Sequence, residues 1–148
     1  MTRNPSAPRS LGYLAGSISQ FMADSLHRNF LAEGFDLTHA QYVLLTDLFE
    51  QDGLTQQALA DKVFKDKAAV KRTVDTLVEK GLVVRESADG ARNNPVRLTG
   101  RARELEGSFR KVAARTLAEA TRGIAPEEME ACLSVLRRLH ARFEQERA

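Results

Sequence analysis

The sequence is poor in the residues that form disulfides, metal cages and membrane spans. Its 148 residues contain one cysteine, Cys132, three histidines and no tryptophan. One cysteine excludes an intramolecular disulfide and a cysteine metal cage, and this fits a reducing cytoplasm. No stretch approaches the roughly 20 apolar residues of a membrane-spanning helix, and the N-terminus lacks a basic start followed by a long apolar run. We therefore expect a cytoplasmic protein without a membrane segment.

Residue types that carry catalysis are present but scattered. An enzyme needs acid, base or nucleophile groups that converge in a pocket. His27, His39 and His140 fall in three different predicted helices without ligand spacing, and no glycine-rich phosphate loop or nucleophile elbow occurs. Cys132 lies beside Leu133 on an apolar stripe, where a free cysteine usually packs as a small hydrophobe. We expect no catalytic residue, no metal and no cofactor, and therefore no enzyme.

Positive charge is distributed unevenly along the chain. Residues 1–54 contain three Lys and Arg against six Asp and Glu, residues 55–103 contain eleven against six, and residues 104–148 contain eight of each. The excess is confined to the central block, although the whole chain carries only +2. A basic block of this kind is where a nucleic-acid phosphate backbone is expected to dock.

The spacing of apolar residues predicts a mainly helical fold with a small β-wing, of the α+β class. Residues 1–10, with Pro5 and Pro8, are expected to form a flexible arm. Thr38 with Gln41 three residues later predicts a capping box at a helix start. A first helix is predicted from Leu11 to about Gly34. After a short helix from Thr55 to about 63 and a connection over 64–67, a longer helix runs to Gly81. Strands are predicted over 82–85 and 95–98, and two further helices from Thr99 to Gly123 and from Pro126 onward.

The two central helices have the pattern of a helix-turn-helix. A short helix, a tight connection and a longer helix place the second helix where it can enter a major groove about 12 Å wide. Arginine can hold guanine through two parallel hydrogen bonds whereas lysine acts as a point charge, so Arg72 is the candidate base reader and Lys65 or Lys67 the phosphate contact. The second helix is expected to bury Val70, Val74, Leu77 and Val78 and to expose Lys67, Ala68, Lys71, Arg72 and Asp75.

The segment between the two predicted strands has the composition of a DNA-binding wing. A hairpin turn signal stands at 89–90. The wing tip is assigned Arg92, Asn93 and Asn94 together with Arg97 of the second predicted strand, residues that suit a minor groove and its phosphates. A solvated hairpin in which Arg92 pairs with Asp89 is the alternative for the wing alone. The wing and the basic helix together favour DNA binding.

These residues resemble the multiple antibiotic resistance regulator (MarR) family of winged helix-turn-helix regulators. The resemblance lies in the segments 37–42, 54–60, 67–82 and 92–99. It implies a homodimer held by the first and last two helices, recognition of double-stranded DNA by the helix after residue 67, and insertion of Arg92 into the minor groove. In one respect the sequence departs from the family pattern: an acid usually stands two residues before that arginine, whereas here Asp89 stands three before it.

The resemblance also implies a division of labour. Residues 11–36 and 100–148 are expected to form the dimerisation region, and residues 37–99 the DNA-binding domain of a ligand-responsive repressor that binds an inverted repeat. A winged-helix protein-interaction module that does not bind DNA is the alternative. The predicted DNA-binding residues are Thr38, Thr55, Lys65, Lys67, Ala68, Lys71, Arg72, Arg92, Asn93 and Arg97, and the small-molecule pocket implied by the resemblance lies near His27, Phe30, His39 and Tyr42.

Overall fold

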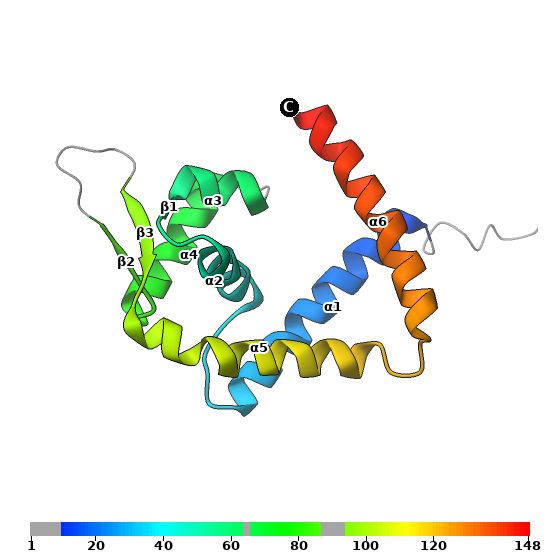
Figure 1. Ribbon diagram of the computed structural model, residues 1–148, viewed down its shortest axis with the longest axis horizontal. Helices are drawn as coiled ribbons and strands as arrows, with labels where there is room; N and C mark the ends of the chain where they lie inside the picture. Colours follow the sequence, from blue (N-terminus) through cyan, green and yellow to red (C-terminus); the bar gives the residue numbers. More distant parts are fainter. Residues whose placement is uncertain (1–9, 64–65, 87–93) are drawn as a thin grey trace, which may run out of the picture. The chain divides into compact units, whose positions relative to one another are not determined.

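The computed structural model describes residues 10–63, 66–86 and 94–148 and confirms a mainly helical fold with a small antiparallel sheet (Figure 1). Contacts divide the chain into two compact units, residues 1–116 and 117–148. The elements are α1 (Leu11–Ala32), α2 (His39–Glu50), β1 (Leu54–Thr55), α3 (Gln56–Val63), α4 (Lys67–Glu79), β2 (Val83–Arg85), β3 (Pro95–Leu98), α5 (Gly100–Ala120) and α6 (Pro126–Arg147).

Side-chain caps fix where several helices begin. The predicted capping box is confirmed, because the Thr38 hydroxyl accepts a hydrogen bond from the Gln41 amide while the Gln41 side chain accepts one from the Thr38 amide. The hydroxyls of Thr55 and Thr99 likewise accept from the amides three residues later, at the starts of α3 and α5. Asp66 caps α4 through the Ala69 amide. Helix α4 therefore begins at residue 67, and the predicted connection over 64–67 is one residue too long.

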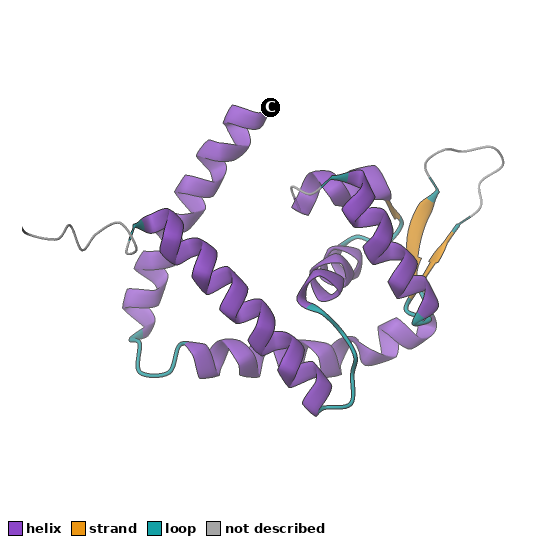
Figure 2. Cartoon of the chain, turned by 180° about the vertical axis from the view of Figure 1, so that it is seen from behind, coloured by secondary structure: helices purple, strands orange, loops and turns teal. Residues whose placement is uncertain are grey.

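The sheet has three strands in the order β1-β3-β2, where the sequence predicted two. Figure 2 shows the strands in orange beside the helices. Strand β3 is central, with Leu54 of β1 opposite Val96 on one side and Val83 of β2 opposite Leu98 on the other. The missed strand β1 has only two residues, too few for an alternating pattern to be visible. Strand β2 spans 83–85 rather than 82–85.

The core of the first unit joins the helices of the predicted DNA-binding domain to α1 and α5. Phe30 of α1 and Phe109 of α5 are almost completely buried and meet edge to face, with ring centroids 5.7 Å apart. Asn29 donates to the Thr116 hydroxyl at 2.8 Å beside them. The remaining core residues include Leu45, Leu48, Leu59, Val70, Val74, Leu77, Val83 and Val96.

The exposed face of α4 is wider than predicted. Val78 was expected on the inner face, but 37% of its surface is exposed, because Val70, Val74 and Leu77 alone define the buried stripe. On α5 the structure buries Thr116 and exposes Leu117.

The second unit contains the end of α5 and helix α6. Pro126 in the first turn, followed by Glu127 and Glu128, starts α6 in the way the sequence predicted. An ion pair between Arg137 and Glu130, 2.9 Å long, lies on its surface. None of the residues of α6 is buried.

Candidate nucleic-acid interface

Helix α4 presents its basic residues to solvent. Its buried residues Val70, Val74 and Leu77 fix the rotation of the helix against the core. The opposite face exposes the predicted contact residues of the N-terminal half, which are Lys67, Ala68, Lys71 and Arg72. The structure thus brings these four predicted residues together on one surface.

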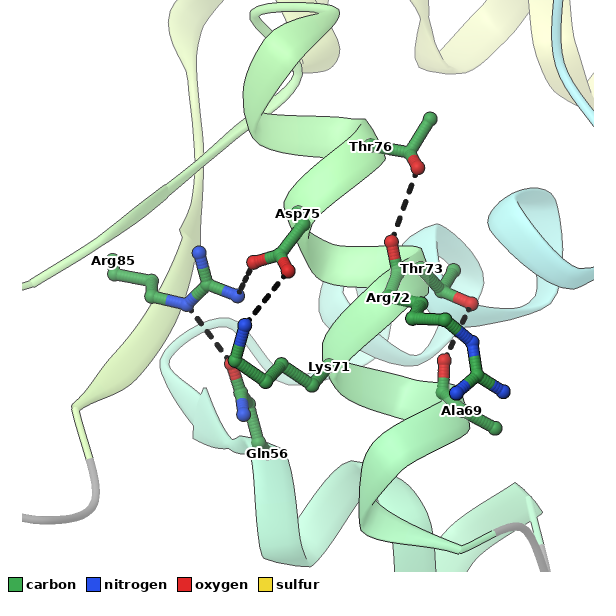
Figure 3. A network of polar contacts seen from close by, with 8 residues as sticks. All are labelled: Gln56, Ala69, Lys71, Arg72, Thr73, Asp75, Thr76 and Arg85. Atoms are coloured by element: carbon green, nitrogen blue, oxygen red, sulfur yellow. Dashed lines mark hydrogen bonds and ion pairs between the residues drawn. The ribbon is translucent and has the colours of Figure 1, made fainter.

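Asp75 links this helix to the wing strand and to α3 (Figure 3). One carboxylate oxygen accepts from Lys71 at 2.9 Å, and the other accepts a short hydrogen bond from Arg85 of β2. Arg85 also donates to Gln56 of α3 at 2.9 Å. Hydrogen bonds from Lys71 and Arg85 hold the pKa of Asp75 below its usual value, so the carboxylate stays ionised at neutral pH.

Arg72 lies outside this network. Its guanidinium extends to the side of α4 away from Arg85 (Figure 3), and no ion pair joins it to another residue within 10–63, 66–86 or 94–148. Lys71, in contrast, forms an ion pair with Asp75. Both residues were predicted on the exposed face of the helix, but not as a pair. Lys71 and Arg72 therefore differ in their ion pairing before any ligand binds.

Arg97 lies at the base of the wing, where its side chain packs closely against the end of α2. On β3 it stands opposite Val84, and its Nε donates to Glu86 at 2.6 Å. The hydrogen bond to Glu86 raises the pKa of Arg97. A Cβ at Gly53 would come 2.7 Å from the Arg97 guanidinium, and Gly53 also has a φ of +78° that favours glycine. Of the other predicted contacts, Lys65, Arg92 and Asn93 lie outside the described residues.

The two predicted threonine contacts have structural partners. Thr38 and Thr55 use their hydroxyl oxygens as caps for α2 and α3, and both are half-buried. A capping hydroxyl keeps its own proton as a donor. Both residues stay candidates for phosphate contacts.

Two further anchors were not predicted. Asp52, after α2, accepts from the amides of Gly53 and Leu98 and from Arg103 of α5 at 2.6 Å, and so ties the sheet to two helices. Lys80, the residue directly after α4, donates to the carbonyl of Asp36 and to Gln41. The side-chain partners in these two anchors lie 39 and 51 residues away, so no local pattern announces them.

Comparison with known proteins points to one family. The family model described as "MarR family" matches residues 37–90. An HTH-type transcriptional regulator of Bacillus subtilis, YdgJ, is 34% identical over 104 residues, which cover 70% of this chain and 63% of that protein. The match over residues 37–90 agrees with the predicted resemblance to the MarR family. It spans less than two thirds of the length of that curated relative. The matched relatives are transcriptional regulators and not enzymes.

Solved structures have the same fold as this chain. A MarR-family regulator from Rhodococcus sp. RHA1 superposes with a TM-score of 0.81 at 22% identity, over 92% of this chain and 96% of that one. A second, from Listeria monocytogenes and complexed with 26mer DNA, gives 0.80 at 17% identity over 93% and 91%. A third, CouR from Rhodococcus jostii RHA1 bound to p-coumaroyl-CoA, gives 0.75 at 22% identity over 88% and 91%. At these identities the likeness shows the fold.

The four residues predicted near a small-molecule pocket separate into two pairs. His27 and His39 line an open depression of about 390 Å³ between α1 and the start of α2. Nε2 of His27 lies 3.6 Å from the Asp36 carboxylate. Phe30 and Tyr42 instead pack together in the core, with ring centroids 5.4 Å apart, and burial raises the pKa of Tyr42.

Other chemistry has little support in the described part of the chain. No group of three or more His, Cys, Asp or Glu residues there is arranged to hold a metal ion. None of the helices described is long and apolar enough to span a membrane. Cys132, expected to pack as a small hydrophobe, is exposed on α6.

Proposed function

We propose that this chain is a sequence-specific MarR-family regulator of transcription that binds double-stranded DNA as a homodimer. The observation that carries the proposal is the exposed N-terminal half of α4, where Lys67, Lys71 and Arg72 share one surface while Val70 and Val74 fix the helix from behind. A helix held in this way can enter the major groove with its side chains already oriented. The DNA-bound Listeria structure of the same fold supports this interpretation.

The two chains of the proposed homodimer are held by residues 11–36 and 100–148, and residues 37–99 contact DNA. The N-terminal half of α1 exposes Leu14, Ile18 and Phe21, and α6 exposes Leu133, Leu136 and Phe143. Exposed apolar surface of this extent is typical of an interface. A two-fold symmetric pair would read an inverted repeat with half-sites about one helical turn, ~34 Å, apart.

Arg72 and the lysines divide the contact between base and backbone. The guanidinium of Arg72, which no ion pair holds in the described chain, is suited to two parallel hydrogen bonds to guanine, whereas Lys65 and Lys67 act as point charges toward phosphates. Arg92 enters the minor groove from the wing, with Asn93 beside it. Arg97, held by Glu86, positions the wing base.

A binding-site selection with purified variants tests these roles. Arg72→Ala should relax the preference at one base position per half-site by about 1–3 kcal/mol. Lys67→Ala should weaken all duplexes alike and reduce the slope of log K against log salt by about 0.9 for each phosphate that the variant no longer neutralises. Arg138→Ala on α6 is a matched control that should change neither. If Arg72→Ala selects the wild-type consensus at the same stringency, the assignment is wrong.

The alternative is a protein-interaction module that never binds DNA. The eleven cations in residues 55–103 against six acids count against it. A gel shift with a random-sequence duplex at low salt separates the two functions, because the basic surface should bind any duplex weakly. Complete failure of the wild-type dimer to shift DNA would favour the interaction module.

The proposed regulator is a repressor that responds to a small-molecule effector. The effector would occupy the depression lined by His27 and His39, and Phe30 and Tyr42, which pack together in the core, would respond to it through α1 and α2. The p-coumaroyl-CoA bound by CouR supports an effector in a protein of this fold. A ligand in the depression would contact α1 and the start of α2 together and could change their spacing.

A further inference from the structure

We propose that Asp75 determines the selectivity of the recognition helix by competing with DNA phosphate for Lys71. The inference rests on the proposed DNA-binding function. Among the described residues, Asp75 is the only carboxylate bonded to a cation of α4, which is Lys71. A carboxylate on a DNA-binding face repels phosphate, so its position there calls for a physical reason.

The two oxygens of Asp75 hold partners of different mobility. Oδ1 accepts from Arg85, whose side chain is 30% exposed and is also fixed by Gln56 of α3. Oδ2 accepts from Lys71, whose side chain is 63% exposed and belongs to the same helix. The carboxylate is therefore anchored on one side and exchangeable on the other (Figure 3).

A DNA phosphate can therefore pair with Lys71 only by displacing the Asp75 carboxylate. A lysine ammonium on its long stem can move from a carboxylate to a nearby phosphate without a change in the helix. Exchange of one anion for another gains little free energy, because the original ion pair is broken. Asp75 meanwhile stays in place through Arg85 and repels the incoming backbone.

This competition lowers the affinity for non-operator DNA more than the affinity for an operator. Binding to non-operator DNA consists almost entirely of phosphate contacts, so the loss of one effective cation reduces it directly. Binding to an operator adds base contacts from Arg72, which depend on the rotation of α4. That rotation is fixed partly by the Asp75–Arg85 pair between α4 and β2. Asp75 thus weakens non-operator binding and supports operator binding.

The decisive variant is Asp75→Asn, compared on operator and random-sequence duplexes of equal length. We expect its affinity for random duplex to rise about three- to tenfold at low salt, with a salt slope steeper by about 0.9 per freed lysine. Operator affinity should stay level or fall, so that the ratio of the two affinities drops. Asp75→Glu, which keeps the charge, should restore the wild-type ratio and slope.

Glu106→Gln on α5 supplies the matched control. Glu106 pairs with Arg110 four residues later, at 2.8 Å, as Lys71 does with Asp75. The variant makes the same change in net charge and removes the same kind of helical ion pair away from α4. If the affinity for random duplex rises equally in both variants, net charge is the cause and the proposal is overturned.

Lys71→Ala in the wild-type background provides a test that does not depend on how Asp75→Asn folds. Because Asp75 neutralises Lys71, removal of Lys71 should weaken random-duplex binding less than removal of Lys67 does in the wild-type background. In the Asp75→Asn background the two effects should become equal. An equal effect of both lysines in the wild type, or an Asp75→Asn variant that weakens both duplexes alike, would overturn the proposal. Failure of the wild type to bind any duplex would instead overturn the proposed function.

Discussion

Helices α4 and α6 are both amphipathic, but only α4 finds its apolar partners within the described chain. Helix α4 has 13 residues and buries Val70, Val74 and Leu77. Helix α6 has 22 residues, buries none and exposes Leu133, Val135, Leu136 and Phe143. Helix α4 therefore packs into the core of the first unit. The apolar stripe of α6 remains exposed to solvent in the described chain.

Helix α1 combines both conditions along its length. Its C-terminal half buries Leu26 and Phe30, whereas its N-terminal half exposes Ile18 and Phe21. An apolar stripe that continues past the core predicts a second packing surface. With the second surface as the proposed dimer interface, the stability of the fold and the association of chains depend on different residues, which mutations can separate.

The largest effect is expected for Phe30→Ala. Phe30 is completely buried and contacts the rings of Tyr42 and Phe109, so its truncation leaves a cavity. The free energy of unfolding should fall by about 3–5 kcal/mol in urea titrations at fixed protein concentration. Phe143→Ala removes the same atoms from an exposed site and should lower it far less when the chains are dissociated. Equal decreases in the two variants would contradict the conclusion that Phe30 is a core residue and Phe143 is not.

A charge on the exposed half of α1 should separate the proposed dimer. Ile18→Glu is expected to weaken association by about tenfold or more, because an unpaired carboxylate would have to be desolvated at the interface. Light scattering over a concentration series should move toward the 16.4 kDa chain mass. Val84→Glu is the matched control, since Val84 is 48% exposed and Ile18 52%. A wild-type mass of 16.4 kDa at micromolar concentration would contradict the proposed dimer.

The contact at the wing base can be tightened by one methyl group. In Gly53→Ala the new Cβ would meet the Arg97 guanidinium at 2.7 Å, and the φ of +78° would be strained. We expect a decrease of about 1–2 kcal/mol in the free energy of unfolding. Gly107→Ala on α5, with open space around it and a helical backbone, should instead stabilise by about 0.5–1 kcal/mol. A neutral result at Gly53 would mean that neither the φ of +78° nor the Arg97 contact constrains this position.

The smallest effect concerns Asp47, whose Oδ2 is buried without a hydrogen-bond partner in the described chain. Burial raises the pKa of Asp47, so the folded state binds its proton more readily than the unfolded state. Ionisation at neutral pH is therefore destabilising, and stability from this group grows as pH falls toward the unfolded pKa of about 4. Asp47→Asn should raise the Tm slightly at pH 7, and the difference should shrink near pH 4. Asp61→Asn, on the exposed surface of α3, should not raise it.

Local signals predicted the helices well. The capping box at Thr38 and Gln41, the Thr99 cap and the Pro126 start depend on residues three positions apart or fewer, and each lies where the sequence placed it. The recognition surface followed from the same periodicity, because the buried stripe of α4 determines which side chains remain outside. The Asp66 cap was missed although the same rule applies to it.

Contacts between distant segments could not be predicted. Lys71 and Asp75 are spaced for an i,i+4 pair, which the sequence does signal, but the pairing of Asp75 with Arg85 depends on how β2 packs on α4. Arg97 was assigned to the wing tip because nothing local shows that Glu86 and Gly53 hold it at the base. Strand β1 becomes a strand only because β3 lies beside it.

The pairing of β1 with β3 also bears on the order in which the chain folds. Leu54 and Val96 stand opposite each other although they are far apart in the sequence, so α3 and α4 are enclosed within the loop that their pairing closes. Loop closure costs chain entropy before any contact offsets it, whereas α2, α3 and α4 meet over shorter separations. We therefore expect the three helices to pack first and the strands to pair afterwards. In reverse, the wing can detach while the three helices remain packed.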